Sequence, residues 1–269
     1  MSTQTSKGTA LVTGASTGIG AVYADRLAKR GYDLILVARS QDKLNEVASQ
    51  IRSTTSRSVE TLQADLTAPA DVKRIAERLS TDASITALVN NAGIAVGGKL
   101  LGANPDDLDQ MIQLNITALT RLAVAAADSF AARGNGLLIN IGSIVALAPE
   151  MLNGSYSGTK AYVQNLSFAL KSELADKGVT VQVVLPGATA TPLWEKAGVP
   201  IHHLPAEIVM TTEDMVDASL AGLDQGEFVT IPSLPNAADF EAFEKARLAL
   251  TPNLSRREPA ARYGIGSAK

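Results

Sequence analysis

A tyrosine and a lysine four residues apart, Tyr156 and Lys160, are the side chains best suited to proton transfer. Apolar residues at helical spacing follow them as far as Gly178, a candidate C-cap, so we expect one helix face to carry both side chains. A free tyrosine ionises near pH ~10, and a nearby ammonium group lowers that pKa. Such a hydroxyl can exchange a proton with a substrate oxygen. The spacing alone equally fits an amphipathic helix without a catalytic function.

The composition narrows the classes of function. The 269 residues include 24 basic and 27 acidic side chains, so a net charge of −3 provides no basic field for nucleic acid. The absence of cysteine excludes disulfides and thiolate metal ligands. No apolar run approaches the ~20 residues that span a bilayer, and the N-terminal residues lack a signal peptide's apolar segment. We therefore expect a soluble, cytoplasmic protein that binds neither nucleic acid nor membranes.

Strand-like and helical patterns alternate along the chain. Apolar runs predict seven strands, at residues 9–13, 33–37, 59–63, 87–90, 137–141, 179–185 and 228–231. Helical patterns lie between them and include one long helix at 105–132, apolar on nearly all sides. This order predicts an α/β fold, a doubly wound, mostly parallel seven-stranded sheet with helices on both faces (Rossmann). With no linker evident, we expect a single domain over residues 1–269, with 252–269 as a C-terminal tail.

Three glycines, Gly14, Gly18 and Gly20, lie between the first strand and the first helix. Glycine there permits a tight turn and the close approach of a pyrophosphate to a helix N-terminus. The spacing G-x-x-x-G-x-G differs from the usual G-x-G-x-x-G pattern, and no Gly-Lys-Ser/Thr follows as in a P-loop. Taken alone, the motif could be only a tight turn.

Several motifs in register resemble the short-chain dehydrogenase/reductase family. They are TGASTGIG at 13–20, NNAG at 90–93, Asn115, Ser143, YSGTK at 156–160, and Pro186-Gly187 with Thr191. The resemblance covers residues 8–232. It implies an NAD(P)(H)-dependent oxidoreductase that transfers a hydride between nicotinamide and a carbonyl or secondary alcohol. A dinucleotide-sensing or scaffold protein on the same fold is the alternative. A methyltransferase would carry an acid at the end of the second strand, where Ala38-Arg39 stands.

The resemblance implies a role for each of four catalytic residues. Tyr156 is the general acid/base, and Ser143 positions the same substrate oxygen. Lys160 lowers the tyrosine pKa and holds the nicotinamide ribose, and Asn115 anchors a water that links Lys160 to solvent. The simpler interpretations are a turn serine for Ser143 and a helix-interior asparagine for Asn115.

The resemblance also implies a set of cofactor-binding residues. Asn90 marks the adenosine side of the cleft, Thr191 meets the nicotinamide carboxamide, and Asp65 contacts the adenine, although Asp65 could equally cap the next helix. The set comprises Gly14, Ser16, Thr17, Gly18, Ile19, Gly20, Asp65, Leu66, Asn91, Ala92, Gly93, Tyr156, Lys160, Pro186, Gly187 and Thr191.

The end of the second strand predicts the choice of dinucleotide. NAD sites of this type usually place a carboxylate there, whereas this chain has Arg39 and Ser40. A guanidinium can bind the 2′-phosphate of NADP through charge-assisted hydrogen bonds, and Ser40 at a helix N-terminus can add a hydroxyl and an N–H. We therefore expect NADP(H) to be favoured, with NAD(H) as the weaker alternative. Arg39 could also be an ordinary surface arginine.

Residues 188–225 are rich in apolar side chains: Leu193, Trp194, Val199, Ile201, Leu204, Ile208 and Met210. In the family this segment is a lid over the substrate, which Met151 and Leu152 face from the other side. We expect an apolar pocket for a hydrophobic carbonyl or alcohol, although the same side chains could simply pack the segment onto the body. His202 and His203 lack a third ligand, so we predict no metal site. The family commonly pairs through the helices at 105–132 and after Tyr156, which implies a homodimer or homotetramer.

Overall fold

A computed structural model describes residues 6–265; residues 1–5 and 266–269, including the end of the predicted tail, lie outside the described residues. The chain divides into two units, Met1–Pro232 and Ser233–Lys269, and each is treated separately below. The expectation of a single domain over residues 1–269 stays a prediction.

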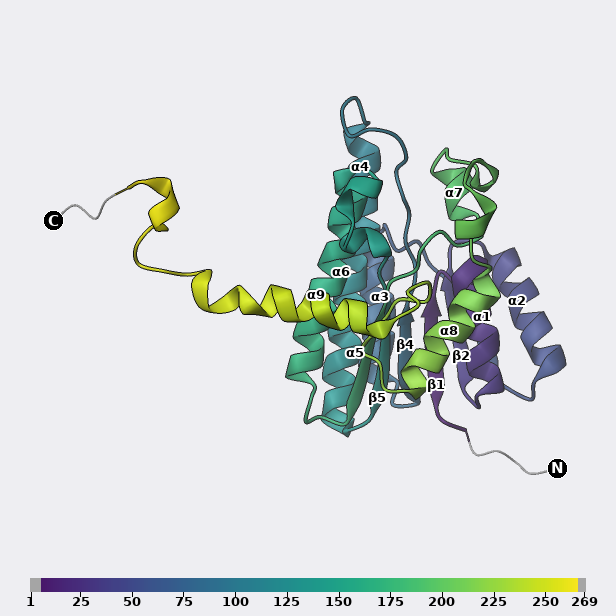
Figure 1. The fold of residues 1–269 in the computed structure, drawn as a ribbon. Coiled ribbons are helices and arrows are strands. Elements are labelled where there is room, and N and C mark those ends of the chain that lie inside the picture. The colour runs from purple at the N-terminus through teal and green to yellow at the C-terminus, as the bar shows by residue number, and fades with distance from the viewer. Residues whose placement is uncertain (1–5, 266–269) are drawn as a thin grey trace. The chain divides into compact units, whose positions relative to one another are not determined.

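The first unit is built on a parallel seven-stranded sheet with the order β3-β2-β1-β4-β5-β6-β7 (Figure 1). The strands are β1 (Thr9–Thr13), β2 (Asp33–Ala38), β3 (Val59–Gln63), β4 (Ile85–Asn90), β5 (Gly136–Ile141), β6 (Val179–Val184) and β7 (Val229–Thr230). The order reverses between β1 and β4, where doubly wound sheets form their ligand crevice. The predicted fold class is confirmed.

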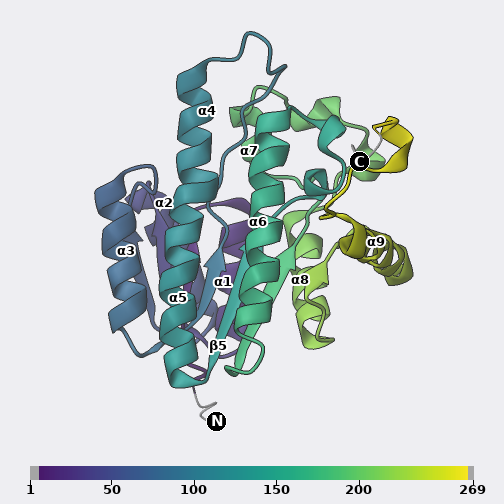
Figure 2. The ribbon, with the colours of Figure 1, turned by 90° about the vertical axis from the view of Figure 1, so that its left-hand side faces the viewer.

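Helices cover both faces of the sheet; Figure 2 looks onto one face, with one helix layer in front of the strands and the other behind them. The helices α1 (Gly18–Lys29), α2 (Gln41–Thr54) and α8 (Thr212–Asp224) pack on one face, and α3 (Pro69–Thr81), α5 (Leu119–Arg133) and α6 (Gly154–Glu173) pack on the other. The central strands bury residues on both faces, for example Val12 toward the first layer and Leu11 toward the second. Two-sided burial explains why the strands are continuous apolar runs in the sequence.

The predicted long helix at 105–132 is interrupted. It consists of α4 (Pro105–Ile112), a π-helical turn at Gln113–Ala118, and α5. The turn contains the buried Asn115, whose side chain hydrogen-bonds the backbone of Ile94. A π turn closes its backbone hydrogen bond over one more residue than an α-helical turn and is frequent at functional sites. The interruption therefore accompanies a tertiary contact that helical periodicity does not reveal.

The prediction that Gly178 is the C-cap of the helix that carries Tyr156 and Lys160 is wrong. Helix α6 ends at Glu173 with Leu174 as its C-cap, and a turn leads on to Gly178. Gly178 has a φ of +67°, and a Cβ there would lie 2.2 Å from the carbonyl oxygen of Gly134. This glycine therefore permits two chain segments to approach closely before β6.

The second unit contains α9 (Ala237–Ala249), which follows its N-cap Asn236. No residue described in this unit is buried, and Phe243, Leu248 and Leu250 are exposed. Neither α8 nor α9 was expected from the sequence.

Candidate active site

The glycine-rich turn forms one end of a cavity at the carboxyl edge of the sheet. Gly14 and Gly18 adopt φ values of +67° and +56°, and a Cβ at Gly20 would lie 2.4 Å from the carbonyl oxygen of Gly14. Thr17, the N-cap of α1, makes no side-chain capping bond to any described residue. The first N–H groups of α1 can therefore bind an anion, which the helix dipole also favours.

Hydrogen bonds tie this turn to the NNAG segment after β4. The Thr13 hydroxyl accepts from the backbone N–H groups of Asn91 and Ala92, both at 3.0 Å, and the Asn91 amide donates to the Thr13 carbonyl at 2.9 Å. Asn90 points elsewhere and donates to the Leu119 carbonyl. The sequence analysis named Thr13 only as the first residue of the TGASTGIG motif and assigned it no role, because its hydroxyl is not titratable.

One cavity of about 830 Å³ brings together most of the predicted site. Gly20 and Asn115 do not line it and instead support residues that do. The predicted residues on its wall are Gly14, Ser16, Thr17, Gly18, Ile19, Arg39, Ser40, Asp65, Leu66, Asn91, Ala92, Gly93, Ser143, Tyr156, Lys160, Pro186, Gly187 and Thr191.

Arg39 and Ser40 line this cavity together with Lys43. The Arg39 side chain is exposed, and no carboxylate among the described residues pairs with its guanidinium. Ser40 caps α2 by accepting from the Lys43 N–H. Asp65 accepts from the N–H and hydroxyl of Thr67, so it closes a local turn and does not cap α3, whose N-cap is Ala68.

Ser143 and Tyr156 meet between β5 and the start of α6. The Ser143 hydroxyl donates to the Pro186 carbonyl and accepts from the Val145 N–H, each at 3.4 Å. Tyr156 is 8% exposed and packs against Met111 and Val145. Burial raises the pKa of Tyr156 to about 12, while a side-chain hydrogen bond with Ser143 acts in the opposite direction. The hydroxyl is therefore held in its protonated form.

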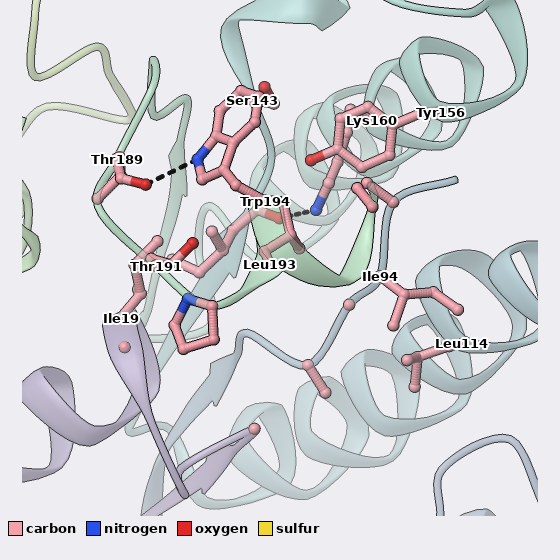
Figure 3. A pocket seen from close by; sticks show the side chains of 18 of the residues that line it. Ile19, Ile94, Leu114, Ser143, Tyr156, Lys160, Thr189, Thr191, Leu193 and Trp194 are labelled. Atoms are coloured by element: carbon pink, nitrogen blue, oxygen red, sulfur yellow. Dashed lines mark hydrogen bonds between the residues drawn. The ribbon is translucent and has the colours of Figure 1, made fainter. Parts of the chain in front are cut away.

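Lys160 is buried beneath Tyr156, one helical turn along α6 (Figure 3). Its Nζ donates to the Ile141 carbonyl at 3.0 Å and lies 5.8 Å from the centroid of the Tyr156 ring. Burial lowers the pKa of Lys160 to about 8. Burial penalises the phenolate and the ammonium alike, so it raises the pKa of the tyrosine and lowers that of the lysine. That Lys160 lowers the tyrosine pKa stays a prediction.

Asn115 connects the π turn to the cavity wall. Its Oδ1 accepts from the Ile94 N–H at 2.9 Å, and its Nδ2 donates to the Ile94 carbonyl at 2.8 Å and to the Thr159 hydroxyl at 3.1 Å. Thr159 in turn donates to the Tyr156 carbonyl. Asn115 therefore fixes both a wall residue and the backbone of the tyrosine helix, and Thr159 is a second residue that the motif analysis did not single out.

The other end of the cavity is apolar. Ile94 and Leu114 line it from one side, and Leu193 and Trp194 from the short helix α7 (Leu193–Lys196) line it from another (Figure 3). The Trp194 indole donates to the Thr189 carbonyl at 2.8 Å. Several other residues expected to face the substrate also line it: Met151, Leu152, Val199, Leu204 and Ile208.

The lining segment is shorter than the expected lid at 188–225. Residues from 212 onward form α8, whose Met215 and Val216 belong to the core. Met210 also packs against the core, and Ile201 does not line the cavity. Among residues 6–265, no group of three or more His, Cys, Asp or Glu side chains could hold a metal ion, and His202 contacts the ring of His203 edge to face.

Asn153 is one of the cavity residues that the sequence analysis did not name. It is the N-cap of α6, and its Oδ1 accepts from the Tyr156 N–H at 3.0 Å. The available signal was an asparagine three residues before the tyrosine, at the start of a helical pattern.

Comparison with known proteins identifies the family. The model of the short chain dehydrogenase family matches residues 8–199. The chain therefore belongs to the short-chain dehydrogenase family, as the motifs predicted. None of the helices in the described chain is both long and apolar enough to cross a bilayer.

Two solved structures are similar over nearly the whole chain. A short-chain dehydrogenase from Sphingobium yanoikuyae in complex with NADPH is 46% identical, with a TM-score of 0.92, and the match covers 95% of this chain and 100% of that one. The bulky-bulky ketone specific alcohol dehydrogenase from Comamonas testosteroni is 42% identical, with a TM-score of 0.88 and coverage of 96% and 99%.

Curated relatives match over a shorter part. Human 17-beta-hydroxysteroid dehydrogenase type 3 is 38% identical over 185 residues, which is 68% of this chain and 59% of the relative. The very-long-chain 3-oxoacyl-CoA reductase-A of Danio rerio is 37% identical over 68% of this chain and 58% of its own length. The chain thus spans about three fifths of these relatives.

The glycine-lined end of the cavity fits a dinucleotide. Gly14 and Gly18 adopt the left-handed backbone of the tight turn, and Gly20 lets the first turn of α1 pack against the Gly14 carbonyl, so the N–H groups at the start of α1 are placed for a pyrophosphate. We expect Gly20→Ala to weaken NADPH binding at least about tenfold, since its Cβ would push against the Gly14 carbonyl and displace the turn. Gly154→Ala is the matched control because no atom lies within 4 Å of its Cβ position. Titration of NADPH fluorescence measures both, and equal affinities would contradict this assignment.

Proposed function

We propose that the protein is an NADPH-dependent reductase of hydrophobic ketones or aldehydes. The observation that carries the proposal is one cavity whose glycine-lined end can take a pyrophosphate and whose other end is apolar, with Ser143, Tyr156 and Lys160 between them. When bound, the dinucleotide supplies the hydride. The side chains of this protein orient the carbonyl and supply the proton.

The burial of the site suits reduction. Tyr156, with a pKa raised to about 12, is protonated at neutral pH and can donate its proton to the developing alkoxide. The Ser143 hydroxyl hydrogen-bonds Tyr156. It can donate to the same oxygen by giving up its 3.4 Å bond to the Pro186 carbonyl. The Lys160 ammonium stabilises the phenolate left behind and can bind the ribose hydroxyls. That Asn115 anchors a water path from Lys160 to solvent stays a prediction.

Arg39 supports the preference for NADPH. Its guanidinium is exposed at the cavity mouth, no carboxylate stands at the end of β2, and Ser40 and Lys43 add a hydroxyl and a second cation. A 2′-phosphate would be attracted here, whereas the ribose of NADH would lack its usual carboxylate acceptor. The similar Sphingobium enzyme, described in complex with NADPH, is consistent with this choice.

The apolar cavity wall supports a hydrophobic substrate. Leu114, Leu193 and Trp194 offer a small, charged keto acid no ion pair. The relatives include an alcohol dehydrogenase specific for bulky-bulky ketones and a hydroxysteroid dehydrogenase. A sensor without turnover would not need the assembled Ser143, Tyr156 and Lys160.

The direct test is oxidation of NADPH by the purified protein with a panel of bulky ketones, small aldehydes and charged keto acids. We expect turnover to be highest for neutral, bulky ketones. Tight NADPH binding without turnover on any carbonyl would favour a sensor, and a preference for small keto acids would contradict the apolar pocket.

The lowered pKa of Lys160 predicts the pH profile of the reduction. Lysine is charged below its pKa, so the ammonium is present below pH 8 and is lost as the pH rises through about 8. Tyr156 stays protonated over this range because its pKa is near 12. We expect kcat/KM for ketone reduction to be flat near neutrality and to fall about tenfold per pH unit above pH ~8. A rise of kcat/KM with pH in that range would contradict the assignment.

The exposed guanidinium of Arg39 predicts the effect of its removal. We expect Arg39→Ala to reduce kcat/KM for NADPH by about tenfold to a hundredfold and to change that for NADH less than about threefold, because only the 2′-phosphate is a bidentate ligand. Arg257→Ala, which removes an exposed arginine that does not line the cavity, is the control. Equal losses for both dinucleotides would remove Arg39 from this role.

We also propose a homo-oligomer. Ile112 of α4, Val124 of α5 and Tyr162 of α6 are exposed, and Figure 2 shows these helices along one side of the sheet. Burial of such residues against a second copy would be favourable. We expect light scattering at micromolar concentration to give a dimer or tetramer and Val124→Glu to lower the mass. A monomeric wild-type protein would contradict this proposal.

A further inference from the structure

The amide of Asn153 joins the helix that carries Tyr156 to the opposite wall of the cavity. Its Oδ1 accepts from the Tyr156 N–H at 3.0 Å. Its Nδ2 donates to the Val96 carbonyl at 2.5 Å and to the Gly98 carbonyl at 3.4 Å. Because an N–H can only donate and a carbonyl can only accept, these partners fix the orientation of the amide. The Asn153 side chain thus uses its acceptor oxygen and its two N–H donors to connect two segments that lie 57 residues apart in the sequence.

The wall that Asn153 holds has few other polar attachments. Residues 95–99 make no backbone–backbone hydrogen bond within the described chain. Upstream, the Asn115 amide holds Ile94 through both its N–H and its carbonyl. Two asparagine amides therefore fix residues 94–98, one from the π turn and the other from the start of α6.

The same wall contacts residues 188–208, here called the lid segment, through Gly97. A Cβ on this glycine would lie 1.9 Å from the Ala197 carbonyl oxygen and 3.5 Å from a methyl group of Val199. The backbone of residues 96–98 therefore packs directly on the segment that follows α7. A shift of this wall would move the lid segment, which also carries Trp194.

We propose that Asn153 is a positioning and specificity-determining residue. It sets the distance between the Tyr156 helix and the 94–98 wall, and through Gly97 it sets the position of the lid segment. A ketone with bulk on both sides of its carbonyl would touch this wall and depend on its position. A small aldehyde would reach the Tyr156 hydroxyl without touching it. This inference rests on the proposed ketone reductase activity.

The test separates the two functions of the amide. Serine and aspartate are both good N-caps, so Asn153→Ser and Asn153→Asp keep an acceptor for the Tyr156 N–H. Both variants lose the amide NH2 group that donates to the Val96 and Gly98 carbonyls, which the shorter serine hydroxyl does not replace. Asn104→Asp is the matched control, since Asn104 caps α4 by accepting from Asp106 and does not line the cavity. Agreement between the serine and aspartate variants excludes an effect of the added charge.

The first measurement is kcat/KM for hexanophenone, which is bulky on both sides, and for propanal, which is not. We expect both Asn153 variants to lose at least about tenfold with hexanophenone and less than about threefold with propanal, because small displacements misalign a reacting group. Asn104→Asp should keep the wild-type affinity for NADPH and the wild-type kcat/KM for both hexanophenone and propanal. Equal losses on the two substrates would mean that Asn153 serves only the helix, and would overturn the proposal.

A second measurement does not depend on turnover. Trp194 is the single tryptophan of the sequence, so its fluorescence reports on the lid segment alone. We expect acrylamide to quench it about twice as strongly in Asn153→Ser, because a loosened wall exposes the indole. If wild-type protein reduces neither carbonyl, the proposed function fails, and this quenching still decides the positioning role. Unchanged quenching in both Asn153 variants would overturn it.

Discussion

The active site depends on the burial of an ammonium group. Lys160 lies in the interior with the Ile141 carbonyl as its hydrogen-bond acceptor among the described residues, and burial brings its pKa to about 8. The same environment raises the pKa of Tyr156 to about 12. Burial thus favours the neutral form of both side chains, because a low-dielectric interior penalises either charge. A site of this kind holds a proton on tyrosine and has a cation close enough to compensate when that proton leaves.

The rest of the first unit places groups around this pair. The parallel sheet brings the carboxyl ends of β1, β4, β5 and β6 to one edge, so residues far apart in sequence line one cavity. Thr13 ties the glycine turn to the NNAG segment, and Asn115 ties the π turn to Ile94 and, through Thr159, to the tyrosine helix. These bonds are buried or half-buried, where an unsatisfied partner would be costly. Hydrogen bonds are directional and apolar packing is not, so this polar network fixes how the cavity-lining segments lie relative to one another.

Local signals were sufficient for much of this structure. The strand at 9–13 matches its predicted limits, because two-sided burial produces a continuous apolar run. The strand at 59–63 also matches, although only Val59 of it is buried. The spacing of Tyr156 and Lys160 placed both on one helix, and the glycine pattern located the turn. The family motifs named the polar residues around Tyr156 and the glycine turn, but not Thr67, Lys99, Gln110, Glu150, Asn153 or Thr189 on the same cavity wall.

The remainder depends on contacts that no local pattern encodes. The π turn at Asn115 accompanies bonds to Ile94, and Gly178 is needed for its approach to Gly134 rather than for a helix end. The periodicity of one segment cannot reveal that Asn115 contacts Ile94 or that Gly178 approaches Gly134. Asn153 could be predicted as a cap, but its two donor bonds reach a loop elsewhere in the sequence. The direction of the tyrosine pKa also needed the structure, since spacing gives the neighbouring cation but not the burial.

The central claim is that the buried Tyr156 hydroxyl supplies the proton during ketone reduction. The most direct test is the single-turnover rate of Tyr156→Phe with saturating NADPH and a bulky ketone, measured together with NADPH affinity. The phenyl ring keeps the packing against Met111 and Val145 and removes only the hydroxyl. We predict a rate lower by about 10²–10⁴-fold with NADPH affinity unchanged. A rate within about twofold of wild type would contradict the account.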